Sequence, residues 1–288
     1  MRFSKWKRET ARSYLQRPVK KMKDKLKAAV YGLAIGDALG VPVEFKKRGT
    51  FHVDDMIGYG THQQPAGTWS DDTSMTLATC DSIRECGTVD CEDMLENFRK
   101  WLFNAAYTVD NKVFDAGGTT VSALRMGKGM DDLYSNGNGS LMRVIPLAFI
   151  DMNAETVSAV SAITHANNIS MNVCCEYVSV AKQLLDGKKL TEATQYCSGR
   201  IPEIHKLDES EIKSTGFVVD TFEAAVWAVA TTDNYKDAVL KAVNLGDDTD
   251  TVAAVAGGLA GIMYGIEGIP AEWVDKLRGK EVIDRCLF

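Results

Sequence analysis

Apolar residues recur along most of the chain at the spacing of an α-helix. In residues 25–39, Leu26, Val30 and Leu33 fall on one stripe of the helix. Glycines leave a neighbouring face of the same helix without side chains, so that another segment could approach its backbone closely. The same 3.6-residue spacing, or a high content of strong helix formers, marks five further segments: 90–103, 154–161, 171–187, 221–231 and 235–245. Alternating Val/Ile-rich segments typical of strands are scarce. The pattern predicts an all-α fold.

The chain shows no linker that would divide it. Only six prolines occur in 288 residues, and no Pro/Ser/Gly-rich stretch separates two halves. We therefore expect a single compact multi-helix domain over residues 26–288, preceded by a basic N-terminal extension of residues 1–25.

Charge is distributed unevenly between these two parts. Residues 1–28 carry a net charge of +9, whereas the remainder carries −15, for a total of −6. The acidic body argues against a nucleic-acid-binding protein. The basic extension could contact an acidic partner, or it could be a solvated leader.

Composition also bears on location. No apolar stretch approaches the ~18 uninterrupted residues of a membrane span, and no secretory signal is recognisable, so we predict no membrane association. The seven cysteines are scattered and include no CxxC pair, which favours neither a disulfide framework nor a zinc site. The cysteines fit a reducing, cytoplasmic setting.

Two distant segments share one chemical pattern: "GTWSDDTSMTLATC" (67–80) and "LGDDTDTVAAVAGG" (245–258). In each, glycine precedes a cluster of Asp with Ser or Thr, and an apolar helical run follows. Capping of a helix explains one such side chain, but not several carboxylates that repel one another. Carboxylate and hydroxyl oxygens are ligands for Mg²⁺, Mn²⁺ or Ca²⁺. If the two helix starts face each other, four Asp with Ser70 and Thr251 could surround two cations.

One segment has a competing interpretation. "DTDTV" (248–252) also matches the D-x-D-x-[TV] signature of haloacid-dehalogenase-type phosphotransferases. That chemistry requires a buried strand before the signature and further motifs after it. Here the preceding residues have a helical pattern and fewer than forty residues follow, so we disfavour this alternative.

Six segments together resemble the ADP-ribosylglycohydrolase family, which includes the dinitrogenase-reductase-activating glycohydrolase and the ADP-ribosylhydrolases. They occur in the family's order from about residue 26 to the C-terminus: "GLAIGDALGVPVEF" (32–45), "AGTWSDDTSMTLA" (66–78), "NGNGSLMRVIPLA" (136–148), "ITHANN" (163–168), "TGFVVDTFEAAVWA" (215–228) and "NLGDDTDTVAAVAGGLAG" (244–261). Any one motif is weakly specific, but six in register are a strong signal.

The resemblance implies an all-α fold with a binuclear Mg²⁺ centre, in which Mn²⁺ is also possible. Its motifs assign six metal ligands: Ser70, Asp71, Asp72, Asp248, Asp250 and Thr251. Glu44, in "PVEF", matches the family's acidic residue beside the metals and is the candidate catalytic residue. Without the resemblance, Glu44 would be taken as a surface residue after a turn.

The remaining motifs resemble the family's substrate cleft. "NGNGS" suggests Asn138, Gly139 and Ser140 as contacts of ribose and diphosphate, because glycine exposes backbone N–H groups. "FDAGGTT" (114–120) suggests a second such loop, with Gly118 as a contact. His165 corresponds to a substrate-side histidine, and Phe217 to an aromatic position that stacks on adenine in some relatives. Without the resemblance, a capping histidine and a core phenylalanine would be the simpler interpretations.

The activity implied is metal-dependent hydrolysis that removes ADP-ribose from modified protein side chains, with N-glycosidic ADP-ribosyl-arginine as the expected substrate. Two further hypotheses stay open. The protein could be an immunity protein against an ADP-ribosyltransferase toxin, with residues 1–24 contacting that cognate transferase. Alternatively, it could be a non-catalytic relative of the same fold that binds ADP-ribose or a transferase.

Overall fold

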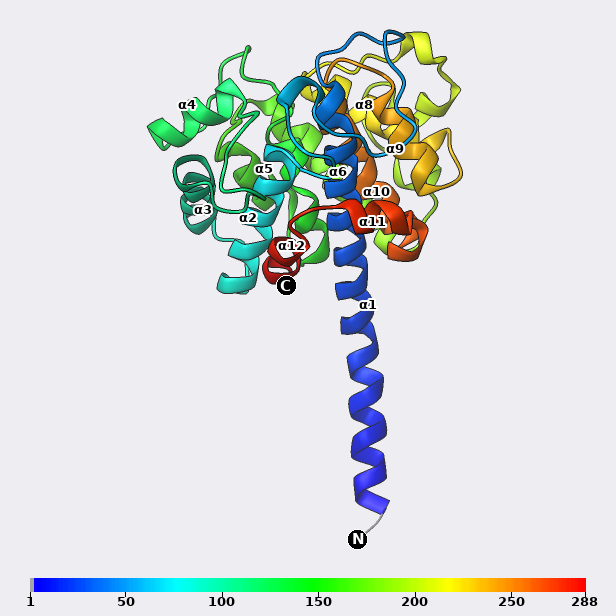
Figure 1. The fold of residues 1–288 in the computed structure, drawn as a ribbon. Helices are drawn as coiled ribbons and strands as arrows, with labels where there is room; N and C mark the ends of the chain where they lie inside the picture. Colours follow the sequence, from blue (N-terminus) through cyan, green and yellow to red (C-terminus); the bar gives the residue numbers. More distant parts are fainter. Residues whose placement is uncertain (1–2) are drawn as a thin grey trace.

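The computed structural model describes the backbone of residues 3–288 and the side chains of residues 20–288. Its centre is formed by two helices that lie side by side, α1 (Phe3–Gly40) and α10 (Thr249–Tyr264), and the other helices surround this pair (Figure 1). Within residues 3–288 there are isolated β-bridges but no strands. The predicted all-α fold is confirmed.

The remaining helices are shorter, and most lie where the apolar periodicity predicts them. Their bounds are α2 (Asp71–Cys86), α3 (Cys91–Asn104), α4 (Gly118–Met126), α5 (Ala154–Ala162), α6 (Asn168–Leu185), α7 (Leu190–Ala193), α8 (Val218–Ala230), α9 (Tyr235–Val243), α11 (Ala271–Lys276) and α12 (Lys280–Cys286). The pattern did not predict α4, α7, α11 and α12; α7, α11 and α12 have seven residues or fewer, which present too few apolar positions to establish a period.

Glycines allow α1 and α10 to approach at backbone distance. A methyl group added at Gly36 would lie 2.1 Å from the carbonyl oxygen of Ala253, and one added at Gly40 would lie 2.3 Å from Cα of Asp250. Gly257 and Gly261 make the same kind of approach from the α10 side. The packing therefore fixes the C-terminal end of α1 against the N-terminal turn of α10, where Asp250 lies.

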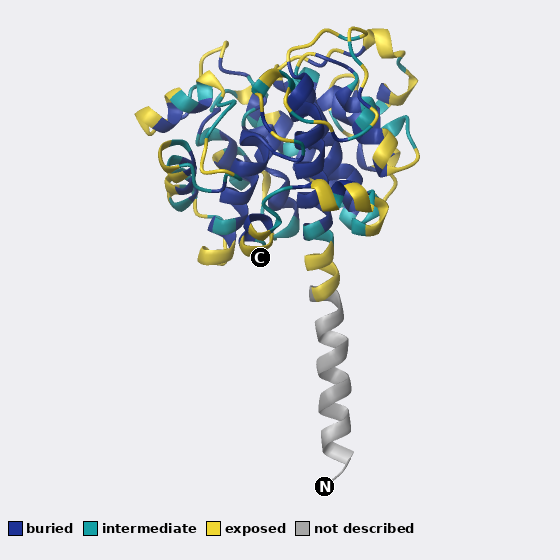
Figure 2. Cartoon of the chain, viewed as in Figure 1, coloured by how far each residue is buried: buried dark blue, intermediate teal, exposed yellow. Residues whose placement is uncertain are grey.

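Burial changes sharply along α1. Residues 20–24 are exposed, whereas Leu26 and nearly all of the helix after it are buried in the core (Figure 2). The predicted boundary after residue 25 thus lies inside a continuous helix, at the point where it enters the body. The basic extension falls mostly on residues whose side chains lie outside the described part of the chain.

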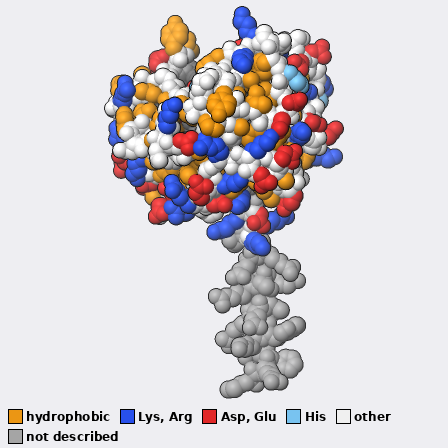
Figure 3. Space-filling model, in the orientation of Figure 1, with side chains coloured by type: hydrophobic (Ala, Val, Ile, Leu, Met, Phe, Trp, Pro, Cys, Tyr) orange, Lys and Arg blue, Asp and Glu red, His pale blue; other side chains and the backbone are white. Residues whose placement is uncertain are grey.

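One helical segment has the length and hydropathy of a membrane span. It is Lys20–Val43, with a mean hydropathy of 1.3, but 94% of its most apolar window is buried inside the protein. A core helix of this kind meets the same criteria without a membrane. On the face drawn in Figure 3, basic and acidic side chains are interspersed over the body rather than gathered by sign.

Candidate active site

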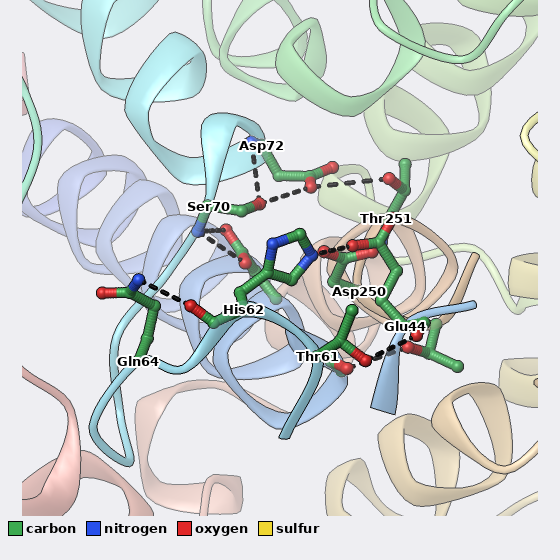
Figure 4. Close-up of polar contacts among 11 residues, drawn as sticks. Glu44, Thr61, His62, Gln64, Ser70, Asp72, Asp250 and Thr251 are labelled. Carbon is green, nitrogen blue, oxygen red and sulfur yellow. Dashed lines mark hydrogen bonds and ion pairs between the residues drawn. The ribbon is translucent and has the colours of Figure 1, made fainter. Parts of the chain in front are cut away.

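The two Asp clusters of the sequence lie together at the start of α2 and the start of α10. Ser70 precedes α2 and donates a hydrogen bond to Asp72 Oδ2 over 2.9 Å. Thr251, in the first turn of α10, lies with its hydroxyl 3.5 Å from the same oxygen (Figure 4). The two helix starts face each other, which is the condition under which the two clusters could share cations.

Helix capping does not account for the carboxylates here. Ser70 already supplies the side-chain cap of α2, and Asp248 precedes α10 without making a side-chain cap bond. Three buried carboxylate oxygens have no hydrogen-bond partner among the described residues: Asp72 Oδ1, Asp248 Oδ1 and Asp250 Oδ2. A buried anionic oxygen that accepts no hydrogen bond costs free energy unless a cation neutralises it. These carboxylate oxygens are therefore suitable ligands for hard divalent cations.

The electrostatics of the cluster point the same way. Burial, reinforced by neighbouring carboxylates, raises the pKa values of Asp71, Asp72 and Asp250 well above their usual range. Burial also raises the pKa of Asp248, although a hydrogen bond from Asn138 opposes the shift. Without bound cations the cluster therefore disfavours full ionisation.

Asp37 is a member of the acidic group that the sequence did not identify as functional. It projects from α1 and accepts hydrogen bonds from the backbone N–H groups of Ser70 and Thr73, and from the Thr73 hydroxyl over 2.6 Å. Burial raises the pKa of Asp37 to about 7, despite these bonds. Asp37 therefore holds the first turn of α2 against α1, and the signal for it was a carboxylate on an apolar helical stripe.

Glu44 lies next to the cluster at the end of the short 3₁₀ turn Val41–Val43, and only 4% of it is exposed. Burial, with the negative charges of Asp115 and Asp248, raises the pKa of Glu44 to about 10. The following residue, Phe45, donates from its N–H to the carbonyl oxygen of Asp247 over 2.7 Å. Both Phe45 and Asp247 have positive φ angles, so a strained backbone pairing ties Glu44 to the start of α10.

His62 and Asp115 are two further site residues that sequence reasoning missed. His62 Nε2 contacts Glu44 Oε2, and Thr61 donates to the Glu44 carbonyl oxygen over 2.8 Å (Figure 4). Ligand atoms of His62, Asp115, Glu44 and Asp250 lie within 4.8 Å of one another. No helical period or repeated motif singles out a histidine in an irregular loop, whereas Asp115 stands two residues before the first glycine of "FDAGGTT".

Two groups of possible metal ligands result, and they share one residue. The first is Asp37, Asp72 and Asp250, and the second is Glu44, His62, Asp115 and Asp250. Both groups join α10 to elements from the N-terminal part of the chain. Acidic residues that could hold a metal ion are thus gathered as expected, but the geometric groups include side chains outside the six assigned by motif.

A pocket of about 250 Å³ opens beside this cluster. Its lining includes eight of the residues predicted for the site, which are Glu44, Asp71, Gly118, Asn138, Gly139, His165, Asp248 and Thr251. Ser70, Asp72 and Asp250 are buried behind them. The pocket therefore has an acidic floor, and its walls come from the glycine-containing loops.

The two glycine segments differ in local structure. Gly118 begins α4, and Gly117 precedes it as the cap residue, so the predicted loop is a helix N-terminus that faces the pocket. A methyl group added at Gly139 would lie 2.9 Å from both the His165 ring and the Thr120 hydroxyl. Glycine at position 139 is thus required by close packing.

Asn138 and Ser140 are engaged within the protein. The Asn138 amide donates 2.9 Å hydrogen bonds to Asp248 Oδ2 and to the Thr221 hydroxyl. Ser140 is fully buried, and its hydroxyl accepts a hydrogen bond from Ser161 over 3.0 Å. Asn138 therefore orients a carboxylate of the cluster, and the Ser140 side chain is not on the pocket lining.

His165 and Phe217 both lie next to the glycine loop at Gly137. His165 is buried with only 2% exposed, and it lines the pocket. Burial, followed by the charge of Arg143, lowers the pKa of His165 to about 3, so the ring is neutral. Phe217 is 40% exposed at the start of α8 and is bridged through its backbone to Gly137 of the pocket wall.

Comparisons with known proteins cover nearly the whole chain. A family model described as ADP-ribosylglycohydrolase matches residues 18–287. The chain is 38% identical to a protein of Pseudomonas putida (strain GB-1) named ADP-ribosylarginine hydrolase Tri1, over 91% of this chain and 76% of that protein. It is 31% identical to the ADP-ribosyl-[dinitrogen reductase] glycohydrolase of Rhodospirillum rubrum, over 88% of this chain and 90% of that protein.

A solved structure agrees with these matches. The structure of an "ADP-ribosylglycohydrolase-related protein complex" superposes with a TM-score of 0.79 at 29% identity, and it covers 93% of this chain and 96% of that chain. All the site residues described above fall within the matched region.

Proposed function

The chain belongs to the ADP-ribosylglycohydrolase family, and from this premise we propose that it releases ADP-ribose from arginine side chains of modified proteins. The family makes it a hydrolase of the glycosidase type. The arginine acceptor is supported by two relatives, from Pseudomonas putida and Serratia proteamaculans, that are named ADP-ribosylarginine hydrolase.

The observation that carries the proposal is the set of buried carboxylate oxygens without partners, gathered beside Glu44 at the edge of the pocket. We assign two cations, Mg²⁺ with Mn²⁺ as an alternative, to the motif residues Ser70, Asp71, Asp72, Asp248, Asp250 and Thr251. When bound, divalent cations would supply positive charge that orients ribose hydroxyls and favours the ionised form of Glu44.

Glu44 is the proposed catalytic base. Its carboxylate takes a proton from the water that attacks C1″ of the ribose, and the bond from C1″ to the arginine nitrogen breaks. The electron pair of that bond leaves with the guanidine nitrogen, which takes up the proton held by Glu44. His62 contacts Glu44 Oε2 and so restricts the orientation of the carboxyl group.

The walls of the pocket suit the rest of ADP-ribose. The free N–H groups at the start of α4, beside Gly118, favour an anion such as the diphosphate. Gly139 and His165 both line the pocket where the ligand would lie, and the exposed ring of Phe217 is available to stack on adenine. Asn138 contributes by orienting Asp248.

The direct test is to incubate the protein with Mg²⁺ and, in separate reactions, with peptides ADP-ribosylated on arginine or on serine. We expect free ADP-ribose from the arginine peptide. Release from the serine peptide alone would assign a different acceptor. Binding of ADP-ribose without release from either peptide would favour the non-catalytic alternative.

A second role is proposed for the basic N-terminal segment. The net charge of +9 over residues 1–28, with residues 20–24 exposed, suits contact with an acidic surface of an ADP-ribosyltransferase, as an immunity protein would require. Side chains of residues 1–19 lie outside the described part of the chain. Deleting residues 1–24 should weaken binding to such a transferase and leave ADP-ribose hydrolysis intact; equal binding by the truncated chain would reject this role.

A cytoplasmic location is proposed on the cysteines. All seven are free thiols, and Cys80 and Cys174 are fully buried. Free thiols of this number are stable in a reducing compartment.

A further inference from the structure

Arg143 is a buried cation that the proposed reaction does not use. It ends the 3₁₀ turn Leu141–Arg143, no part of it is exposed, and its guanidinium lies 4.3 Å from the centre of the Phe98 ring. No carboxylate pairs with it among the described residues, and its Nε and Nη1 atoms have no hydrogen-bond partner there. Burial of an arginine whose donors are incompletely satisfied costs free energy of folding, which points to a role for this side chain.

The only side-chain acceptor of Arg143 in the described residues is Thr164. Arg143 Nη2 donates to the Thr164 hydroxyl over 2.8 Å and to the Val160 carbonyl oxygen over 3.2 Å. The Thr164 hydroxyl in turn lies 2.9 Å from Nδ1 of His165. Three groups thus form one chain of hydrogen bonds from the buried cation to the histidine ring.

The chemistry of the three groups determines which atom donates and which accepts in each of these hydrogen bonds. A guanidinium has only donors, so the Thr164 oxygen must accept from Arg143. The hydroxyl proton then has one acceptor within hydrogen-bond reach in the described residues, which is Nδ1 of His165. With Nδ1 accepting, the hydrogen of a neutral imidazole must lie on Nε2.

Nε2 is on the side of the ring that meets the pocket. His165 lines the pocket with Gly137 and Gly139, and methyl groups added at these glycines would lie 3.7 and 3.4 Å from Nε2. The backbone of His165 is held in place, because its N–H donates to the Ser161 carbonyl oxygen over 2.9 Å. Nε2 has no hydrogen-bond partner within residues 20–288 and is left for a ligand.

We propose that Arg143 is a positioning residue that acts through Thr164 to hold His165 as the tautomer with its hydrogen on Nε2, so that the ring donates a hydrogen bond to an oxygen of bound ADP-ribose. The identity of this ligand rests on the proposed function, whereas the tautomer does not. Arg143 itself touches no substrate.

The tautomer can be read by long-range ¹H–¹⁵N correlation spectra of the ¹⁵N-labelled full chain. The sequence has four histidines, so His165 is assigned by the signal that is lost in His165→Gln. We expect a protonated Nε2 and an unprotonated Nδ1 in the unaltered protein. A hydrogen on Nδ1 would overturn the proposal even if no variant folds.

Two variants of Thr164 test this series of hydrogen bonds. Thr164→Val removes the hydroxyl at nearly constant volume and should produce a mixture of tautomers, whereas Thr164→Ser retains the hydroxyl and should preserve Nε2–H. Arg143→Met removes the obligatory donor and should also produce a mixture, because the Thr164 hydroxyl can then accept from Nδ1. Spectra of Thr164→Val and Arg143→Met that both match the unaltered protein would contradict the proposal.

Binding of free ADP-ribose in the presence of Mg²⁺, measured by calorimetry, tests the consequence. Loss of one well-oriented hydrogen bond should raise Kd roughly 3–10-fold in Thr164→Val and leave Thr164→Ser within about twofold of the unaltered protein. A changed tautomer with unchanged Kd would refute the substrate contact. Failure of the unaltered protein to bind ADP-ribose would count against the proposed function and leave the tautomer result standing.

Discussion

Two opposing electrostatic effects act on Glu44: burial among carboxylates raises its pKa, and bound cations would lower it. Its burial among Asp115, Asp248 and Asp72 raises its pKa to about 10, which keeps a proton on the carboxyl group of the metal-free protein. A catalytic base must lose that proton near neutral pH. Positive charge must therefore enter the cluster before Glu44 can act.

Glu44→Gln isolates the charge of this residue, because the amide keeps the shape of the carboxyl group. Binding of ADP-ribose should persist, whereas hydrolysis should fall roughly 10²–10⁴-fold, the range for a lost general base. Steady-state release of ADP-ribose and calorimetric binding measure the two effects separately. Glu155→Gln, at an exposed position of α5, is the matched control and should behave like the unaltered protein; an unchanged rate in Glu44→Gln would remove Glu44 from the mechanism.

Individual residues were predictable from the sequence where they belong to a pattern. Asp72 and Asp250 stand in two similar segments, so their meeting could be anticipated. Asp37 appears as a single carboxylate on an apolar stripe, and His62 lies in an irregular loop, so neither belongs to a repeated pattern. Their roles depend on long-range packing, which brings Asp37 to residues 33 and 36 positions away.

At the scale of elements, the contact between α1 and α10 determines where the cluster forms. Gly32, Gly36 and Gly40 face α10 at intervals of four residues, and an added methyl group at each would overlap the α10 backbone. The sequence indicated this close approach through the spacing of the glycines, but it did not identify α10 as the partner helix. The pairing joins residues more than 200 positions apart, which no local pattern encodes.

Gly36→Ala should destabilise the protein by forcing these helices apart. The new methyl group would lie 2.1 Å from the Ala253 carbonyl oxygen, and overpacking of this kind costs about 1–3 kcal/mol. Urea denaturation followed by circular dichroism measures the change. The control is Gly118→Ala in α4, where an added methyl group meets no atom within 4 Å; equal stability of the two variants would contradict the packing described here.

At the scale of the whole molecule, the acidic cluster makes stability depend on pH and on cations together. Asp37 and Glu44 have pKa values near 7 and 10 in the folded chain, above their ordinary values of 3.8 and 4.5. Their contribution to stability is therefore complete below about pH 4 and is lost as the pH rises through the folded pKa values. Asp55 behaves oppositely: the hydrogen bond from Lys276 lowers its pKa to about 2, so its stabilising contribution is complete above about pH 4 and is lost as the pH falls toward 2.

The metal-free protein should thus lose thermal stability between pH 5 and pH 8. Mg²⁺ should raise Tm, because binding only to the folded state stabilises it, and the increase should be larger at pH 8, where more carboxylates are ionised. Thermal denaturation at pH 5, 6.5 and 8, with Mg²⁺ or with a chelator, provides the comparison. A chelated protein whose Tm rises with pH over this range would contradict the account of the cluster.

The central claim is that cations held by the buried carboxylates are needed for release of ADP-ribose. Its most direct test is a titration of the metal-stripped full chain with Mn²⁺, with free Mn²⁺ followed by electron paramagnetic resonance and ADP-ribose release from an arginine-modified peptide measured in the same samples. We expect two bound Mn²⁺ per chain, activity that rises with their occupancy, and loss of both binding and activity in Asp250→Ala. Full hydrolysis by the stripped protein in excess chelator would contradict it.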